Sequence, residues 1–314
     1  MNKLLKRYQF LKELKRLAKE NYAQGKPLCV MDDIVFKTML SSDTEDSREA
    51  LRYLLSACTH RAISKVQVTN NDLPPLHMDA KVSRLDVHVI FNDGEAADLE
   101  MQMEKSTDDL KTRAAYYAAM LMAGQSRKGH RYGEIKRVYQ IFFLNCILFP
   151  GSDKLPRRYF YMEEEEHDRL TNVTEVIFYE MPKLELKVQN ILERKVDINS
   201  LPEEEKWCIY MKYRHEEQTA ELIKKLYRQE EGIMLAEKAV AGISRDYKKY
   251  VRWMAITKNR MEFEEKMYRS KQEGLQEGRN EASLDIARKM KEMGDAVEKI
   301  HAITGLSIET IERM

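Results

Sequence analysis

Two short stretches of the sequence are the most informative about the fold: Arg84-Leu85-Asp86-Val87 and Asp98-Leu99-Glu100-Met101-Gln102. Phe91-Asn92-Asp93-Gly94-Glu95 lies between them. Apolar residues alternate with other side chains from Val87 to Phe91, which is the period-two pattern of a half-buried β-strand. Asn92-Asp93-Gly94 predicts a three-residue hairpin loop, because Gly94 can take the left-handed conformation that such loops need. We therefore expect the two stretches to be the arms of a β-hairpin.

This hairpin predicts a pair of facing carboxylates. Asp86 and Glu100 are equally far along the chain from Asp93, and directly opposed residues have Cβ atoms about 4.5–5.5 Å apart. Gln102 shares their face, because side chains alternate along a strand. Two such carboxylates repel each other unless a cation lies between them, and hard ions such as Mg²⁺ prefer carboxylate oxygens. Metal binding and a solvated acidic face are the two interpretations of this geometry.

The composition limits the class of protein. The 314 residues include 53 basic and 52 acidic side chains, so any basic surface for a polyanion must be local. No apolar run reaches the ~18 residues of a membrane span, and the basic N-terminus leads into a charged helical pattern rather than a signal peptide. The four cysteines are scattered and form no CxxC pair, as expected of free thiols in a reducing cytoplasm. We expect a cytoplasmic protein with no membrane segment.

The elements around the hairpin predict an α/β core. Leucines among charged residues predict an amphipathic helix over residues 1–24, and a second helical pattern covers residues 46–59. Val138–Leu144 is a nearly continuous apolar run, typical of a strand that is covered on both faces. Tyr159–Met162 and Glu175–Met181 could add strands to the same sheet. From Leu201 onward the pattern is helical.

Two helices can bring charged side chains to the carboxylate pair. Asp33 opens a helical pattern, where an N-cap is the simplest role, and Lys37 lies at i+4 and could pair with it. A helix that Thr107 can cap runs to about Ala123 and begins shortly after Gln102, so its first turns should stand beside the pair. Arg113 lies in those turns; it could hold a phosphate or form a surface ion pair.

The last stretch, residues 294–314, predicts two short helices joined by a turn at Gly305. Asp295 and Ser307 are N-cap candidates, and five apolar residues could pack together: Ile300, Ile303, Leu306, Ile308 and Ile311. This pattern is similar to a helix-turn-helix, whose second helix would read a DNA groove. Its Glu309 and Glu312 oppose phosphate contact, so a packed helical hairpin or an oligomer contact is the favoured interpretation.

The order of these pieces resembles a known family. Asp33-Ile34-Val35-Phe36-Lys37 is followed by Arg84-Leu85-Asp86-Val87, then by Glu100-Met101-Gln102, by Arg113 with Tyr116-Tyr117, and by a hydrophobic strand. This order is similar to that of the Rpn-type recombination-promoting nucleases, also called PD-(D/E)XK nuclease family transposases. The resemblance covers about residues 30–235, and the Glu-Gly-Leu-Gln-Glu-Gly-Arg segment at 273–279 also resembles that family.

The resemblance implies a restriction-endonuclease-like core, a mixed sheet flanked by helices, with an all-α C-terminal region. It divides the chain into an N-terminal helix (1–29), a nuclease-like domain (30–200), a helical region (201–293) and a terminal helical hairpin (294–314). It further implies metal-dependent cleavage of DNA phosphodiester bonds, in recombination, mobile elements or defence. A homodimer through the C-terminal helices would fit such an enzyme.

The resemblance also implies roles for individual residues. Asp86 matches the metal-binding Asp, Glu100 the acid of the (D/E)xK motif, and Gln102 takes the place of the Lys. Asp33 is an additional acid near the site, while Arg113 or Lys37 could supply the positive charge that Gln102 lacks, as phosphate contacts. The expected cofactor is Mg²⁺, or Mn²⁺ or Ca²⁺, and the expected partner is DNA. The alternative is a DNA-binding or assembly protein on a nuclease scaffold that no longer cuts.

Overall fold

The computed structural model describes residues 27–69, 72–73, 83–92, 94–103, 109–126, 129, 131–245, 272, 274 and 278–314. The chain divides into two compact units, Met1–Trp253 and Met254–Met314. The amphipathic helix predicted for residues 1–24 and the predicted cap Thr107 lie outside the described residues. The four-part division expected from the resemblance is finer than these two units and stays a prediction.

The predicted hairpin is present, but its first arm begins at Val87 rather than at Arg84. Strand β4 (Val87–Phe91) pairs antiparallel with β5 (Glu95–Gln102), with Val87 opposite Leu99 and Phe91 opposite Glu95. Gly94 has a positive φ angle of 98°, as predicted for a three-residue loop of this kind, and Asn92 also has a positive φ angle, 46°. The Asn92 side chain also accepts a hydrogen bond of 3.0 Å from the Ser64 backbone N–H, which ties the turn to the chain before the neighbouring strand.

The hairpin belongs to a mixed six-stranded sheet in the order β1-β4-β5-β6-β8-β7. The other members are β1 (Val66–Val68), β6 (Val138–Leu144), β7 (Arg157–Tyr159) and β8 (Thr174–Glu180). Strands β5, β6 and β8 are parallel, and β6 is buried along its whole length, as its apolar run predicts. The strand predicted at Tyr159–Met162 is wrong in its bounds, because pairing with β8 ends at Tyr159. A separate two-stranded sheet joins β2 (Asp72–Leu73) to β3 (Ser83–Arg84).

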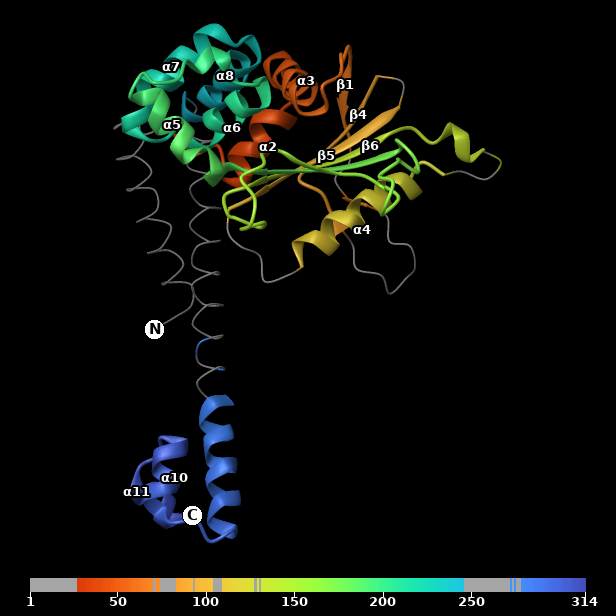
Figure 1. Cartoon of the computed structure of the whole chain (residues 1–314). Coiled ribbons are helices and arrows are strands. Elements are labelled where there is room, and N and C mark those ends of the chain that lie inside the picture. Colours follow the sequence, from red (N-terminus) through yellow and green to blue (C-terminus); the bar gives the residue numbers. More distant parts are fainter. Residues whose placement is uncertain are drawn as a thin grey trace, which may run out of the picture. The chain divides into compact units, whose positions relative to one another are not determined.

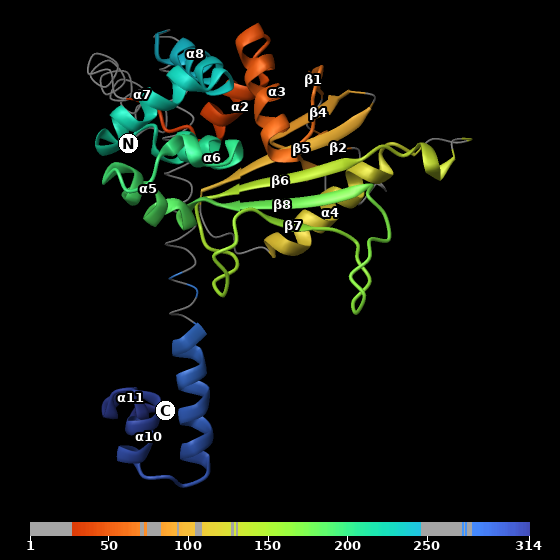
Figure 2. The same ribbon diagram turned by 45° about the horizontal axis from the view of Figure 1, so that its top comes forward.

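Helices cover both faces of the six-stranded sheet (Figures 1 and 2). On one face lies α4 (Leu110–Ala123), whose Leu110 and Ala114 pack against Phe142 and Phe178. On the other face lies α2 (Asp33–Ser41), whose Phe36 ring meets that of Phe143 at 6.0 Å. The remaining helices of this unit are α3 (Glu45–Thr59), α5 (Glu185–Leu192), α6 (Glu203–Tyr213), α7 (Ala220–Gln229) and α8 (Glu231–Arg245). Short 3₁₀ turns occur at Tyr132–Glu134, Met181–Leu184, Ile198–Ser200 and Glu217–Thr219. The predicted α/β class is therefore confirmed, in a form consistent with a restriction-endonuclease-like core.

The second unit is helical. Residues 278–292 are followed by α10 (Val297–Thr304) and α11 (Ile308–Arg313), around a core of Ala287, Met290, Ile300 and Ile311. Ser307 caps α11 as predicted, but Ala296 rather than Asp295 precedes α10. Ile303 and Ile308 are 58% and 44% exposed, so the predicted apolar cluster forms only in part. No helix among the described residues of either unit is long and apolar enough to cross a membrane.

Candidate active site

Asp86 and Glu100 are held side by side by hydrogen bonds from the Asp86 and Met101 backbone N–H groups. Glu100 Oε1 accepts a hydrogen bond of 3.0 Å from the Asp86 N–H, and Asp86 Oδ2 accepts one of 3.1 Å from the Met101 N–H. The register of β4 and β5 leads to this arrangement: Val87 and Leu99 are the last paired residues, and Asp86 and Glu100 are the next residues along the two chains. The hairpin thus holds one carboxylate just before its first arm and the other near the end of its second arm.

Helix α2 adds a cation and a third acid. Lys37 Nζ lies 2.8 Å from Asp33 Oδ1 and 2.8 Å from Asp86 Oδ1, so it bridges the two carboxylates. Burial lowers the pKa of Lys37, but the charges of Asp86 and Asp33 outweigh it and the net pKa is raised. The N-cap predicted at Asp33 is wrong: Asp32 caps the helix through the Ile34 N–H at 3.0 Å, and Asp33 is the first helical residue.

Helix α4 brings Arg113 toward the same face. The N-cap is Asp109 rather than the predicted Thr107, and Arg113 lies in the first turn of the helix, as the sequence predicted. Its Nε and Nη2 atoms are buried and have no hydrogen-bond partner among the residues that the structure describes. Its charge lowers the pKa of Glu100 against the larger effect of burial, and its Cζ lies 6.0 Å from the Tyr117 ring centroid. A half-buried guanidinium with unused donors is suited to receiving an anion.

Gln102 completes the face formed by the hairpin. Its Nε2 donates a hydrogen bond of 3.3 Å to Glu100 Oε2, and its backbone oxygen accepts one of 2.9 Å from the Asn145 N–H. The bond to Glu100 engages the amide nitrogen, which leaves the amide oxygen to accept a hydrogen bond from water. Asp33, Lys37, Asp86, Glu100 and Gln102 therefore form one connected network.

A third buried carboxylate was not assigned from the sequence. Asp98 is fully buried on the strand that carries Glu100, and its Oδ2 accepts a hydrogen bond of 2.5 Å from Gln140 Nε2 on β6. Burial raises the pKa of Asp98 to about 8. Two signals could have found the pair: Asp98 shares the alternation of Glu100 and Gln102, and Gln140 is the one polar residue in the Val138–Leu144 run.

The two carboxyl groups of the site are harder to ionise than free carboxyl groups. Burial is the largest cause of raised pKa values at Asp86 and Glu100, and mutual repulsion among the acids adds to it. No three His, Cys, Asp or Glu side chains in the described part of the chain converge as a ready-made metal cluster. A donor set of two carboxylates nevertheless fits Mg²⁺, because this ion keeps several waters and is often held by only one or two carboxylates.

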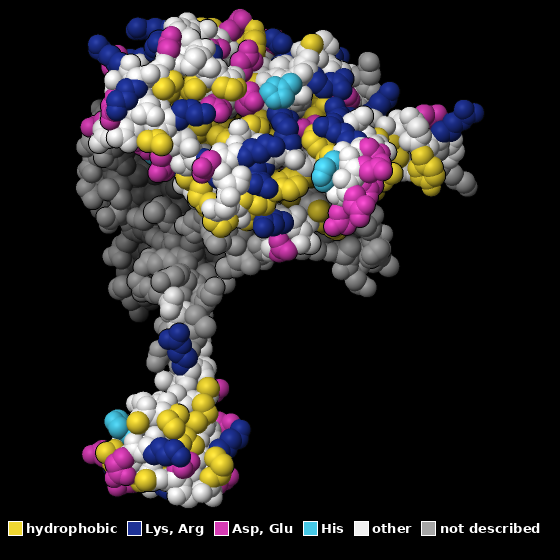
Figure 3. Space-filling view, viewed as in Figure 1, with side chains coloured by type: hydrophobic (Ala, Val, Ile, Leu, Met, Phe, Trp, Pro, Cys, Tyr) yellow, Lys and Arg dark blue, Asp and Glu magenta, His cyan; other side chains and the backbone are white. Residues whose placement is uncertain are grey.

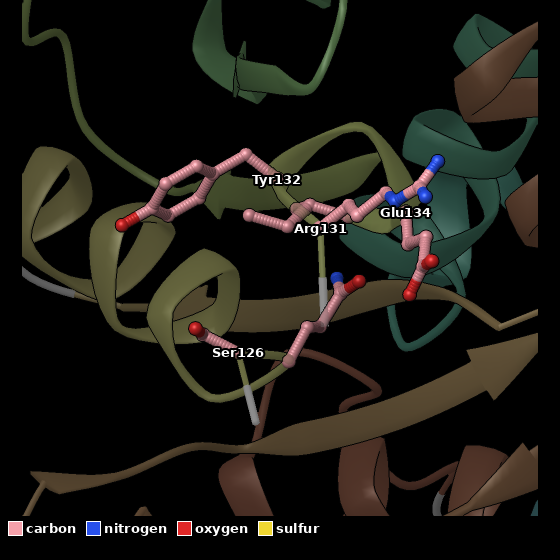
Figure 4. Close-up of a pocket in the computed structure, with 6 residues that line it drawn as sticks. Ser126, Arg131, Tyr132 and Glu134 are labelled. Atoms are coloured by element: carbon pink, nitrogen blue, oxygen red, sulfur yellow. The ribbon is translucent and has the colours of Figure 1, made fainter. Parts of the chain in front are cut away.

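A small hollow elsewhere in the unit is not part of this network. It encloses about 20 Å³ and is lined by Gln125, Ser126, Arg131, Tyr132, Glu134 and Ile135 (Figure 4). These residues lie between the end of α4 and the start of β6, whereas Glu100 and Gln102 lie toward the end of β5, which runs parallel to β6. A volume of this size holds about one water, so it offers no site for a nucleotide.

Comparison with known proteins identifies the family. No curated protein and no solved structure matches the chain. The model of the PD-(D/E)XK nuclease family transposases matches residues 30–273, which is well over half of the sequence and contains all the residues of the network above. The match extends from before α2 to beyond α8, through the whole six-stranded sheet. The chain therefore belongs to the PD-(D/E)XK nuclease family transposases.

Proposed function

We propose that this protein is a Mg²⁺-dependent DNA endonuclease that hydrolyses phosphodiester bonds, linked to mobile elements or recombination. Membership of a nuclease family supports hydrolysis of phosphodiesters. The observation that carries the finer proposal is the pair Asp86 and Glu100, held together by hydrogen bonds of 3.0 and 3.1 Å from the Asp86 and Met101 N–H groups. Beside it lies Arg113, whose buried Nε and Nη2 have no hydrogen-bond partner among the described residues. The pair supplies oxygen ligands, and the guanidinium supplies donors for a phosphate.

In this proposal Asp86 and Glu100 hold the cation, with water completing its shell; Mn²⁺ or Ca²⁺ could occupy the same ligands. Such a cation supplies positive charge against the scissile phosphate and makes an attacking water more acidic. Part of the negative charge of Asp86 is balanced by Lys37, whose Nζ atom lies 2.8 Å from the Asp86 Oδ1 atom. Asp33 assists by holding Lys37 in place from one turn away on α2.

In this proposal Gln102 and Arg113 together take the role of the Lys in the (D/E)xK motif. The Gln102 amide oxygen can orient the attacking water but brings no charge. Arg113 brings charge and a planar set of donors that matches phosphate oxygens, so it would bind the scissile phosphate and stabilise charge that develops on it.

A plasmid-nicking assay with Mg²⁺ tests the proposal. The native chain should nick supercoiled DNA, and Glu100→Gln and Asp86→Asn should each abolish nicking while circular dichroism shows a native fold. Glu95→Gln is the matched control: it is buried on the same strand but pairs with Arg61 at 3.1 Å, away from the network. It should nick at the native rate.

Undiminished nicking by both site variants would overturn the assignment. No nicking by the native chain with Mg²⁺ or Mn²⁺, together with retained DNA binding and no rise in melting temperature with either metal, would favour the alternative of an inactive DNA-binding or assembly protein. A bound ion must raise the melting temperature by mass action, so the two functions are separable.

We also infer that two copies associate through the C-terminal helices. The support is the exposure of large apolar side chains on the second unit, since a monomer would leave them in contact with water. They are Ile286 (46%), Met293 (73%), Ile303 (58%) and Ile308 (44%).

A further inference from the structure

Four side chains at the β7 edge of the sheet form a cluster of cations on aromatic rings. Arg157 Cζ lies 4.6 Å from the Phe149 ring centroid and 5.7 Å from that of Tyr159, and Lys111 Nζ lies 4.8 Å from Phe149. The two rings meet at 5.7 Å, and both pack on the buried Phe178. We call Lys111, Phe149, Arg157 and Tyr159 the β7-edge cluster. Its aromatic base is anchored to the core, so its cations have defined positions.

The β7-edge cluster lies on the same face of the sheet as the catalytic acids. The register places Glu100 opposite Phe142, Phe142 opposite Phe178, and Phe178 opposite Arg157. Paired residues point to the same face, so this row runs straight across the sheet from the acid to the arginine. Three strand spacings of about 4.8 Å put their backbones ~14 Å apart. Lys111 lies in the first turn of α4, two residues before Arg113, and its side chain is directed to Phe149.

The cations of the β7-edge cluster are available to an anion. Neither Lys111 nor Arg157 forms a carboxylate ion pair among the described residues, whereas the neighbouring Arg158 pairs with Glu175 at 2.7 Å. Arg157 Nε donates a hydrogen bond of 3.0 Å to the Tyr159 hydroxyl, which still leaves its terminal nitrogens. The acid nearest to Lys111 in sequence, Asp109, is committed to capping α4 through the Lys111 and Thr112 N–H groups at 3.1 and 3.2 Å.

We propose that the β7-edge cluster binds the phosphate backbone of the DNA substrate about four nucleotides from the bond that is cut. The estimate follows from ~14 Å divided by the 3.4 Å per nucleotide along one strand. This inference rests on the proposed nuclease function. Charge complementarity supports it: the space-filling view, which looks onto the β7 edge, shows Lys and Arg side chains running beside hydrophobic ones (Figure 3). Aromatic rings orient the cations without neutralising them, which carboxylates would do.

Salt-dependent binding tests the surface. Fluorescence anisotropy of a labelled DNA duplex is measured between 50 and 200 mM salt with Glu100→Gln protein, which binds without cutting. Adding Lys111→Gln and Arg157→Gln removes two phosphate contacts, so the slope of log K against log salt should fall in magnitude by about 1.8. Affinity should fall equally for unrelated sequences, because phosphate contacts carry no sequence information.

Two further variants make the outcome decisive. Arg169→Gln is the matched control, since Arg169 also stacks on an aromatic ring, Phe160, at 3.6 Å but lies outside the β7-edge cluster. It should leave the slope unchanged, and the charge-keeping pair Lys111→Arg with Arg157→Lys should retain it. An unchanged slope in the Gln pair, or an equal loss in Arg169→Gln, overturns the inference. Either result leaves the nuclease proposal standing, because nicking by the native chain is measured separately.

Discussion

Arg113 lowers the stability of the fold, because two of its buried donors have no hydrogen-bond partner among the described residues. These donors are Nε and Nη2, and a buried unsatisfied donor costs about 1–3 kcal/mol. Arg113→Met should therefore raise the free energy of unfolding by about 1 kcal/mol. It should also slow nicking by about 100-fold, as expected for loss of a transition-state donor. Urea unfolding and nicking rates measure the two effects.

The control for that variant is Arg113→Lys, which keeps the charge but not the planar set of donors. Its nicking rate should lie between those of the native and Met proteins. If Arg113→Met instead lowers stability and leaves the rate unchanged, Arg113 has a structural role and does not contact phosphate.

Asp98 makes stability depend on pH. Its pKa is about 8 in the folded protein against 3.8 ordinarily, so between these values the folded state holds a proton that the unfolded state has lost. Stability is therefore greatest at low pH within this window and falls as the pH rises toward 8. Asp98→Asn stays neutral and can still accept the hydrogen bond from Gln140. The contribution of residue 98 to the free energy of unfolding should then no longer fall as the pH rises. The variant should be more stable than the native chain at pH 8.

Urea midpoints at pH 5, 6.5 and 8 measure this effect. The native and Asp98→Asn curves should converge toward the acid end and separate at pH 8. Parallel curves would show that Asp98 is ionised in the folded protein, in which case a cation or the Arg113 charge must compensate it.

At the scale of elements, the β4–β5 turn should be sensitive to its glycine. Gly94 has a φ of 98°, and a Cβ there would meet Lys136 Cγ at an ordinary 3.6 Å, so the cost of a side chain comes from the backbone. Gly94→Ala should lower the free energy of unfolding by about 1–2 kcal/mol. Gly133→Ala is the control, because it has no positive φ and no atom within 4 Å of its Cβ position. Urea unfolding should show a loss for Gly94→Ala alone.

The hairpin and its register could be predicted from the sequence because they depend on local rules. The alternation of side chains and a three-residue loop place Asp86 opposite Glu100 without knowledge of the rest of the chain. The pairing of Lys37 with Asp33 was predictable for the same reason, from helical spacing. The bond between Lys37 and Asp86 was not, because it depends on how Phe36 seats α2 against Phe143.

The contacts that could not be predicted from the sequence are those between residues far apart along the chain. Asp98 gains its partner from β6, a parallel strand whose register with β5 is set by the whole sheet, so the sequence could mark Asp98 and Gln140 as unusual residues but could not show that they form a bond. The predicted cap at Asp33 failed by one residue, a common error at helix ends. Ile303 and Ile308 have helical spacing for a core but lie exposed, because Ile300 and Ile311 fill the small core of the second unit.

At the scale of the whole molecule, a divalent cation should stabilise the fold in a pH-dependent way. A cation at 100 times its Kd adds about 2.7 kcal/mol to the free energy of unfolding. The raised pKa values of Asp86 and Glu100 mean that protons compete with the cation for these carboxylates. The rise in melting temperature with Mg²⁺ should thus be larger at pH 8.5 than at pH 6.

Thermal melting of the native chain and of the double variant Asp86→Asn with Glu100→Gln tests this. The double variant should show no metal-dependent rise at either pH. An equal rise in both proteins would place the bound cation somewhere other than the hairpin.

The two units separate assembly from catalysis, and a truncation can show this. The residues of the site network all belong to the unit Met1–Trp253, while the exposed apolar side chains proposed to join two copies belong to Met254–Met314. Ending the chain at Trp253 should therefore convert a dimer to a monomer and keep Mg²⁺-dependent nicking. Light scattering after size-exclusion chromatography gives the mass, and the plasmid assay gives the activity. Ile303→Glu with Ile308→Glu in the full chain is the finer variant, since both side chains are exposed and their loss should break the dimer without unfolding the unit. A truncated chain that remains a dimer would move the interface to the nuclease unit.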